Sequence, residues 1–418
     1  MKTYNTEIIS VGTELLLGHV TNTDARDVSE LLSRIGVNVR WHTVVGDNPG
    51  RLRQAIDIAR SRADILITTG GLGPTYDDLS KETLAECFGL PLVFHPEEEE
   101  KIRAYLVTIG RPCTENNLRQ AWLPEGCTPF ENHNGTAPGC GFTAGGVHVA
   151  MLPGPPRELR MMIETGLIPW LLQFSEGLLL SHDIRVFGLG ESAVEALLHD
   201  RMEVMRNPTL ATYAADGEVR LRLTATAADR AAAEALCAPA LREVREVLGD
   251  LVYALDEPSL EAVCLRLLTE RGLTFASAES CTGGLIAKRI TDLPGASAVF
   301  LGGVVSYTNG VKAKVLGVPE ETLEKYGAVS RETALAMAAG VRKLTGADLA
   351  VSVTGICGPA SDERDTPVGT GFVGFAAPDL LVCRPIRMGT ERDLGRIRAA
   401  GHAFDMLRRY LTGTLKDT

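Results

Sequence analysis

The sequence lacks paired cysteines: its nine cysteines are scattered singly, and none belongs to a C-x-x-C pair. In a chain of 418 residues this pattern indicates reduced thiols and disfavours a disulfide framework or a zinc site. The sequence also lacks an apolar run of membrane-spanning length, and residues 1–11 contain no apolar leader. We therefore expect a cytoplasmic protein with no membrane partner.

A surplus of basic residues is missing as well, since the formal net charge is −11. This charge argues against non-specific electrostatic binding to nucleic acid, so we expect no direct nucleic-acid partner. Phosphate groups remain possible ligands, because backbone N–H groups and helix N-termini bind them without net charge.

The length predicts two or three domains. Residues 1–173 and 256–418 alternate short apolar strands with amphipathic helices, which predicts mostly parallel sheets covered by helices on both faces. Residues 174–255 contain an alanine-rich helix and strands without an evident catalytic cluster. The predicted fold class is α/β: two α/β domains joined by a small α+β domain.

A general base of the usual kind is also scarce in the C-terminal domain, because His402 is the only histidine from Asp256 onward. A Ser–His–Asp or Cys–His site within this domain is therefore improbable. The segment AESCTGG offers Ser280, Cys281 and Thr282 as nucleophiles near the start of a predicted helix, where free N–H groups favour developing negative charge. A simpler interpretation is that Ser280 or Thr282 only caps the helix.

Lysine is the other established activator of serine, provided that burial keeps it neutral. The segment GGVVSYTNGVKAK supplies Lys312 and Lys314 just after a predicted strand. Tyr307, at the end of that strand, can orient or relay the proton between hydroxyl and amine. The alternatives are a solvated lysine and a packing tyrosine.

Two further C-terminal segments suit an anionic substrate. TGICGPA, from Thr354 to Ala360, combines glycines and a hydroxyl in a strand-to-loop turn that can present N–H groups. Arg392 stands at the predicted start of the last helix, where a guanidinium can clamp a phosphate.

In the N-terminal domain, TTGGLGPTYDD joins a buried strand to a helix. Its glycines let N–H groups close on a phosphate, and Asp77 and Asp78 are candidate Mg²⁺ ligands. The segment is neither a Walker A loop nor G-x-G-x-x-G. Other polar residues at predicted strand ends are Glu14, Asp47, Thr136 and Arg157. Ordinary turn and cap chemistry is the alternative for such residues.

The motifs AESCTGG, GGVVSYTNGVKAKVLGV, GAVS, SVTGICGP, PVGT and ERDLGRIRAA resemble, in order and spacing, the C-terminal domain of the CinA family, competence/damage-inducible protein A. The resemblance implies a nicotinamide-nucleotide amidase that converts nicotinamide mononucleotide to nicotinate mononucleotide and ammonia without a cofactor. It makes Ser280 the nucleophile, Lys312 its base and Tyr307 an assisting residue. The residues that it implies for substrate binding are Thr282, Gly283, Thr354, Gly355 and Arg392.

The chain departs from the family pattern T-G-I-A-G-P-G-G at Cys357, Ala360 and Ser361, and an acidic residue is replaced by Gly310. These differences put loop geometry and rate in doubt more than the type of reaction.

The N-terminal motifs resemble the molybdopterin-binding-like domain of CinA proteins. The implied activity is metal-dependent hydrolysis of ADP-ribose to AMP and ribose 5-phosphate, with Mg²⁺ or Co²⁺ as the metal, and the family likeness also implies a homodimer. The implied nucleotide-binding residues are Gly12, Gly71, Gly73, Pro74, Thr75, Thr136, Pro153 and Gly154, and the implied metal ligands are Glu14, Asp47 and Asp78.

Three readings of function stay open on the sequence alone: a two-headed pyridine-nucleotide salvage enzyme, a molybdopterin-handling protein, and a regulatory competence or DNA-damage protein that acts through a protein partner. Within the C-terminal site, Cys281 is the rival nucleophile, but it would need a helix terminus or a lysine to ionise.

Overall fold

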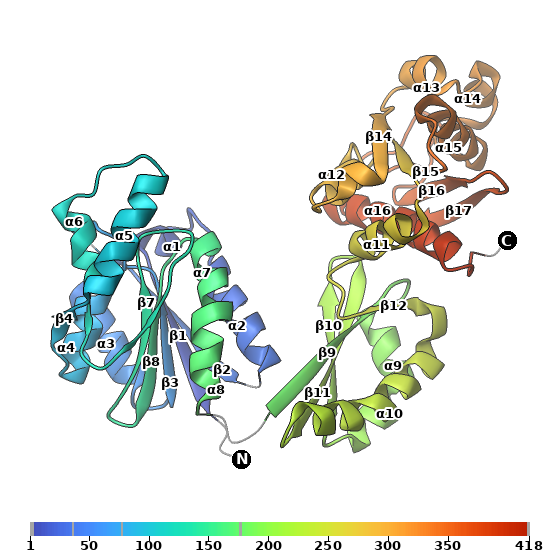
Figure 1. Ribbon diagram of the computed structural model, residues 1–418. Coiled ribbons are helices and arrows are strands. Elements are labelled where there is room, and N and C mark those ends of the chain that lie inside the picture. Colours follow the sequence, from blue (N-terminus) through green and yellow to red (C-terminus); the bar gives the residue numbers. More distant parts are fainter. Residues whose placement is uncertain (1–3, 36, 77, 175–177, 416–418) are drawn as a thin grey trace. The chain divides into compact units, whose positions relative to one another are not determined.

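The computed structural model describes residues 4–35, 37–76, 78–174 and 178–415. It forms two compact units, one of residues 1–181 with 225–236 and the other of residues 182–224 with 237–418. The six-stranded sheet belongs to the first unit and the five-stranded sheet to the second, whereas strands of the four-stranded sheet have residues in both (Figure 1).

The N-terminal α/β region is centred on a six-stranded sheet in the order β2-β1-β3-β8-β7-β6. Strands β2, β1, β3 and β8 run parallel to one another. Strand β7 pairs antiparallel with β8, and β6 pairs antiparallel with β7. A short antiparallel pair, β4 with β5, lies outside this sheet. The strands are β1 (Asn5–Val11), β2 (Asn38–Val45), β3 (Ile65–Thr69), β4 (Leu92–Phe94), β5 (Trp122–Pro124), β6 (Thr128–Phe130), β7 (Gly139–Ala144) and β8 (Val147–Leu152). The helices are α1 (Thr13–Leu16), α2 (Thr23–Arg34), α3 (Pro49–Ala59), α4 (Ser80–Phe88), α5 (Pro96–Thr108), α6 (Glu115–Leu118), α7 (Pro156–Met162) and α8 (Ile168–Leu172), with a π-helical turn at Ile163–Leu167.

Alternation along β1 explains why helices cover both faces of this sheet. Ile8 belongs to a core formed with α2 and α7, whereas Ile9 belongs to a core formed with α3 and α4. Successive side chains of a strand point to opposite faces, so an uninterrupted apolar strand requires cover on both sides. Figure 1 shows these helices flanking the sheet.

The middle region holds a four-stranded sheet in the order β10-β11-β9-β12, in which β10 pairs antiparallel with β11 and β9 with β12. Its elements are β9 (Leu178–Val186), α9 (Glu191–Val204), β10 (Thr209–Ala215), β11 (Glu218–Ala227), α10 (Arg230–Leu248) and β12 (Val252–Leu255). This is the small α+β arrangement that the sequence predicts.

The C-terminal α/β region has a five-stranded sheet in the order β14-β13-β15-β16-β17. Strands β14, β13 and β15 are parallel to one another. Strand β16 pairs antiparallel with β15, and β17 pairs antiparallel with β16. The elements are α11 (Leu260–Arg271), β13 (Phe275–Glu279), α12 (Leu285–Thr291), β14 (Phe300–Val305), α13 (Asn309–Leu316), α14 (Glu320–Tyr326), α15 (Arg331–Thr345), β15 (Leu349–Gly355), β16 (Thr370–Ala376), β17 (Leu381–Arg387) and α16 (Arg392–Leu411). One face packs against α11, α12 and α16, and the other against α13, α14 and α15.

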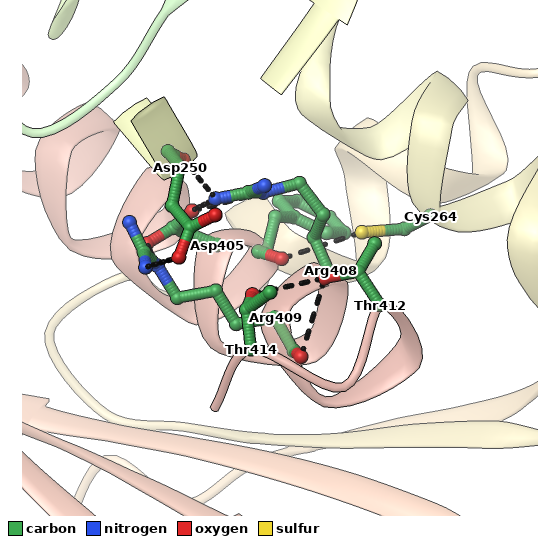
Figure 2. A network of polar contacts seen from close by, with 8 residues as sticks. Asp250, Cys264, Asp405, Arg408, Arg409, Thr412 and Thr414 are labelled. Atoms are coloured by element: carbon green, nitrogen blue, oxygen red, sulfur yellow. Dashed lines mark hydrogen bonds and ion pairs between the residues drawn. The ribbon is translucent and has the colours of Figure 1, made fainter. Parts of the chain in front are cut away.

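A buried ion network fixes α16 to the turn that follows α10 (Figure 2). The Asp405 carboxylate accepts hydrogen bonds from Arg408 at 2.6 Å and from Arg409 at 2.7 Å. Arg408 also donates to the backbone carbonyl of Asp250 at 3.0 Å. Because removing one partner of such a network leaves a buried charge unpaired, the network favours one position of α16.

The α/β fold class is confirmed, including the mostly parallel N-terminal sheet and the closing helix from Arg392 to Leu411. In the C-terminal sheet, two strand pairs are parallel and two are antiparallel. Ser259 caps α11, since its hydroxyl accepts a hydrogen bond from the N–H of Ala262 at 3.3 Å. The sequence analysis did not identify α9, α13, α14 or β17. Within the described part of the chain, no helix combines the length and apolarity needed to cross a membrane.

Candidate active site

The segment AESCTGG leaves β13 at the carboxyl edge of the C-terminal sheet. The N–H of Ser280 donates to the carbonyl of Val353 on β15 at 2.9 Å, and the N–H of Ser306 after β14 donates to the carbonyl of Glu279 at 2.7 Å. These bonds hold three neighbouring strand ends together, the place where parallel sheets present their functional loops.

Lys312 lies on α13 and points back to the nucleophile loop. Its amine lies 3.2 Å from Ser280 Oγ and 2.7 Å from the carbonyl oxygen of Ser306. Lys312 is 1% exposed and Ser280 is 8% exposed, so both groups meet in a largely dehydrated place. The structure thus brings the predicted nucleophile and its predicted base within hydrogen-bond distance, whereas Lys314 is exposed.

Burial lowers the pKa of Lys312 from 10.5 to about 8. The charged amine loses hydration in the interior, and no carboxylate is among the described groups that shift its pKa. At pH 7 about one tenth of such an amine is neutral and able to accept a proton. The amine donates to Ser280 Oγ and to the Ser306 carbonyl, and after loss of a proton its lone pair can accept the hydrogen of the Ser280 hydroxyl instead.

Glu279 is a residue that the sequence analysis missed. Its buried carboxylate accepts hydrogen bonds from the N–H groups of Gly284, Ile286 and Ala287, at 2.9 to 3.0 Å. These are the first N–H groups of α12, so the expectation that they stay free for a developing negative charge is wrong. The available signal was an acidic residue just before a Gly-rich turn into a helix, a favourable position for capping.

Tyr307 enters the site differently from the sequence expectation. Its side chain is 61% exposed, and its hydroxyl lies 3.4 Å from Arg392 Nη2. Its backbone carbonyl lies 3.5 Å from the amine of Lys312. The described contacts do not include one between the phenol and Ser280, so a proton relay through Tyr307 stays a prediction.

Arg392 reaches the site from the first residue of α16. Its guanidinium donates to the carbonyl of Gly358 at 2.5 Å, and the residue is exposed. An exposed cation beside the phenol of Tyr307 is the only part of the predicted substrate-binding set that offers a positive charge to solvent. It therefore suits a substrate phosphate.

The other predicted substrate contacts are more enclosed. The hydroxyl of Thr354 is buried and donates to the carbonyl of Ala328 at 2.7 Å. The hydroxyl of Thr282 is also buried, without a hydrogen-bond partner in the described structure. Gly283 is exposed at φ +60°, and Gly355 is packed so closely that a Cβ would lie 2.5 Å from Met388 Cε. These residues shape the loops, and contact of the two hydroxyls with substrate stays a prediction.

Cys281 and Cys357 are both buried, and their thiols interact. The hydrogen bond with Cys357 and burial raise the pKa of Cys281 well above its ordinary value. A protonated thiol is a poor nucleophile, which favours Ser280 over Cys281. His402 packs edge-on against Phe187 at a ring distance of 5.0 Å, consistent with a structural role.

The N-terminal domain holds a cavity of about 580 Å³ at the carboxyl ends of its parallel strands. It is lined by all the predicted nucleotide-binding residues, Gly12, Gly71, Gly73, Pro74, Thr75, Thr136, Pro153 and Gly154. They come from the loops after β1, β3 and β8 and from the loop before β7. Gly154 lies beside the glycine turn, since a Cβ there would be in ordinary van der Waals contact with Gly70 Cα at 3.5 Å. Arg157 is exposed and does not line the cavity.

The predicted metal ligands Glu14, Asp47 and Asp78 line the same cavity. Asp47 accepts from the N–H of Thr13 at 2.8 Å, and Asp78 accepts from the N–H of Thr75 at 2.9 Å. In the described ranges, no three acidic, histidine or cysteine side chains gather as a ready metal cluster, and Asp77 lies outside those ranges. The oxygen donors nevertheless fit Mg²⁺, which commonly takes one or two carboxylates and completes its shell with substrate phosphates and water.

Two more carboxylates line this cavity, and the sequence analysis did not single them out. Burial, with the nearby charges of Asp27 and Glu14, raises the pKa of Asp24 to about 6. Burial also raises the pKa of Glu158. The cavity is lined by acidic groups without a lysine or arginine, so an anionic ligand there requires backbone N–H groups or a cation.

Comparison with protein families matches three segments. Residues 7–173 match the probable molybdopterin binding domain, residues 181–254 the damage-inducible protein CinA KH domain, and residues 257–411 the CinA C-terminal domain. A CinA-like protein of Desulfovibrio desulfuricans is 47% identical to the chain over 411 residues, 97% of this chain and 96% of that protein. The chain belongs to the CinA family.

Other CinA relatives agree with this assignment. A CinA-like protein of Kosmotoga olearia is 45% identical over 97% of this chain and 98% of its own length. A crystal structure of a competence/damage inducible protein from Agrobacterium tumefaciens is 40% identical, and the match covers 37% of this chain and 97% of that one, with a TM-score of 0.35. The names of these proteins state no reaction.

Proposed function

We propose that the C-terminal domain of this CinA protein hydrolyses nicotinamide mononucleotide to nicotinate mononucleotide and ammonia, with Ser280 as nucleophile and Lys312 as base. The observation that supports it most is the 3.2 Å distance between Lys312 Nζ and Ser280 Oγ in a buried setting. The choice of nicotinamide mononucleotide rests on the resemblance of the six C-terminal motifs to nicotinamide-nucleotide amidases.

The proposed reaction has two halves. Ser280 Oγ attacks the amide carbonyl carbon while neutral Lys312 takes the hydroxyl proton, and the resulting ammonium gives that proton to the departing nitrogen. Ammonia leaves and an acyl ester remains on Ser280. Water then attacks the ester with Lys312 again as base, which releases the carboxylate and restores the serine.

Backbone N–H groups are the available stabilisers of the tetrahedral oxyanion. The N–H groups of Gly284, Ile286 and Ala287 are occupied by Glu279, and that of Gly283 donates to the carbonyl of Ser280. Those of Cys281 and Thr282 have no such acceptor among the described residues, and they directly follow the nucleophile. We propose that they face the oxyanion, a common arrangement in acyl transfer.

We predict that kcat/KM for nicotinamide mononucleotide rises with pH and levels off with an inflection near pH 8. The reason is that the reactive form contains neutral Lys312, and burial lowers the pKa of this amine to about 8. Initial rates of ammonia release between about pH 6 and 10 would show it. A rate that falls steadily over this range, or no ammonia release at all, would refute the proposal.

For the N-terminal domain we propose metal-dependent hydrolysis of ADP-ribose to AMP and ribose 5-phosphate, the reaction that the resemblance implies. The supporting observation is that loops from four strand ends bring the predicted nucleotide and metal residues to one cavity. A bound divalent cation would lower the negative charge on the pyrophosphate. Glu14, Asp47 and Asp78 would hold it, while the glycine turn at 70–73 presents N–H groups to phosphate.

We predict that EDTA abolishes ADP-ribose cleavage and leaves nicotinamide mononucleotide hydrolysis unchanged, because the serine–lysine reaction uses no metal. Both reactions are followed in one preparation by separating AMP and by measuring ammonia. Added Mg²⁺ or Co²⁺ restores the first reaction. Loss of the amidase in EDTA would contradict the serine–lysine mechanism.

Two other functions follow from the family names, a molybdopterin-binding role and a regulatory role in competence or DNA damage. A cavity that binds molybdopterin but cleaves no ADP-ribose would favour the first. Intact folding without either hydrolysis would favour the second, through a protein partner. The homodimer and the cytoplasmic location stay predictions.

A further inference from the structure

Two cysteines lie beside the proposed nucleophile on separate loops. Cys281 follows Ser280, and Cys357 stands two residues after the end of β15. Strands β13 and β15 are parallel neighbours with Glu279 opposite Val353, so their loops leave the sheet side by side. Both thiols belong to the same core cluster and interact with each other.

Two arginines on successive turns of α16 hold these loops together. Arg396 donates to the carbonyl of Thr282, next to Cys281, at 2.9 and 3.2 Å. Arg392 donates to the carbonyl of Gly358, next to Cys357, at 2.5 Å. Residues four apart share one helix face, so a single face of α16 clamps the backbone beside each thiol.

The hydrogen bond between the two thiols makes them chemically unequal, and the arginines add to the difference. The hydrogen bond from Cys281, helped by the charges of Arg392 and Arg396, lowers the pKa of Cys357 to about 7, while Cys281 stays protonated. A thiolate beside a thiol is the arrangement in which one sulfur is oxidised and the other resolves it.

We propose that Cys281 and Cys357 form a peroxide-sensitive modification site that switches the amidase off by closing into a disulfide. The Cys357 thiolate attacks one oxygen of a peroxide, breaks the O–O bond and becomes a sulfenic acid, and the departing oxygen takes a proton to form water or an alcohol. The Cys281 sulfur then attacks the sulfenic sulfur, its proton goes to the departing hydroxide, and water leaves. The protein loses two hydrogens and the peroxide is reduced.

The inhibition rests on the proposed function, because it acts through Ser280. A bond from Cys281 to Cys357 pulls the residue after the nucleophile toward the neighbouring loop and disturbs the 3.2 Å approach of Ser280 Oγ to the amine of Lys312. Catalytic groups tolerate little displacement. The thiols are 8% and 4% exposed, which restricts the oxidant to a small one such as hydrogen peroxide.

The test uses the reduced full chain treated with hydrogen peroxide, followed by catalase. Ammonia release from nicotinamide mononucleotide is measured, and unreduced peptides are mapped by mass spectrometry. We expect a Cys281–Cys357 cross-link and at least about tenfold loss of rate, both reversed by dithiothreitol.

Two variants separate this site from other cysteines. Cys357→Ala, which restores the residue usual in the family, is expected to resist peroxide, whereas Cys383→Ala removes another buried thiol of the same domain and is expected to respond like the parent. Cys127 and Cys140 also interact, in the N-terminal domain, so their oxidation serves as an internal reference for peptide mapping.

No Cys281–Cys357 cross-link under conditions that oxidise other thiols would overturn the proposal, and so would a cross-linked protein with full amidase activity. If the untreated protein lacks amidase activity, the proposed function fails instead. The cross-link itself is still read by mapping in that case, so the two failures are distinguishable.

Discussion

Ser280→Ala is expected to lower kcat for nicotinamide mononucleotide hydrolysis by at least about 10³-fold, because the covalent route loses its nucleophile. The methyl group that replaces the hydroxymethyl fits the same buried place, so circular dichroism and thermal unfolding should stay close to those of the parent. Ammonia release in single-turnover and steady-state assays measures the effect.

The matched control is Cys281→Ala at the next position. The thiol of Cys281 is protonated at neutral pH, because its pKa is raised well above the ordinary value, so this variant should keep its rate within about tenfold. The opposite ranking, with Cys281→Ala inactive and Ser280→Ala active, would assign the nucleophile to sulfur.

Lys312→Met is expected to remove the amidase to a similar extent and yet stabilise the fold. The pKa of Lys312 falls from 10.5 to about 8 on folding, so below pH 8 the folded protein holds a charged amine at a cost of about 3 kcal/mol. Methionine has a similar volume and no charge, so it removes this cost. It also leaves the Ser306 carbonyl without its hydrogen-bond donor, and that loss cancels about 1 kcal/mol of the stabilisation. A net gain of about 1–2 kcal/mol in the free energy of unfolding at pH 7 follows.

The pH dependence of this difference has a definite sign. Between pH 8 and 10.5 the unfolded chain keeps the lysine proton while the folded protein has released it, so the parent gains stability as pH rises. The advantage of Lys312→Met should therefore shrink across that window. Urea unfolding at pH 7 and pH 10 tests it, with Lys314→Met as the control for an exposed lysine on the same helix. If Lys312→Met is less stable than the parent at pH 7, the free-energy cost assigned to the buried charged amine is wrong.

The sequence placed the candidate nucleophiles 280–282 and the candidate bases Lys312 and Lys314 after neighbouring predicted strands. The resemblance to the CinA C-terminal domain then selected Ser280 and Lys312. The sequence could also predict the N-terminal cavity, since Gly71, Asp47 and Gly154 each follow a strand of one parallel sheet. These inferences depend on the alternation of strands and helices, which hydrophobic patterning indicates well.

Hydrophobic patterning does not predict how individual side chains in the loops are oriented. Thr354 turns its hydroxyl to the carbonyl of Ala328, and Tyr307 directs its phenol toward Arg392, because of loops that carry no periodic pattern. Glu279 could serve as a cap only once the turn at 281–284 had placed three N–H groups around it. Similarly, the raised pKa of Asp24 depends on burial beside Asp27 and Glu14.

The measurement that tests the central claim most directly is the titration of the Lys312 amine by nuclear magnetic resonance, with lysine labelled at Nζ by a heavy nitrogen isotope. The signal is assigned by its absence in Lys312→Met. The serine–lysine account predicts an inflection near pH 8 and a perturbed titration in Ser280→Ala, which lacks the neighbouring hydroxyl. An inflection near 10.5 that is indifferent to Ser280→Ala would show an ordinary solvated lysine, and the proposed activation of Ser280 would be wrong.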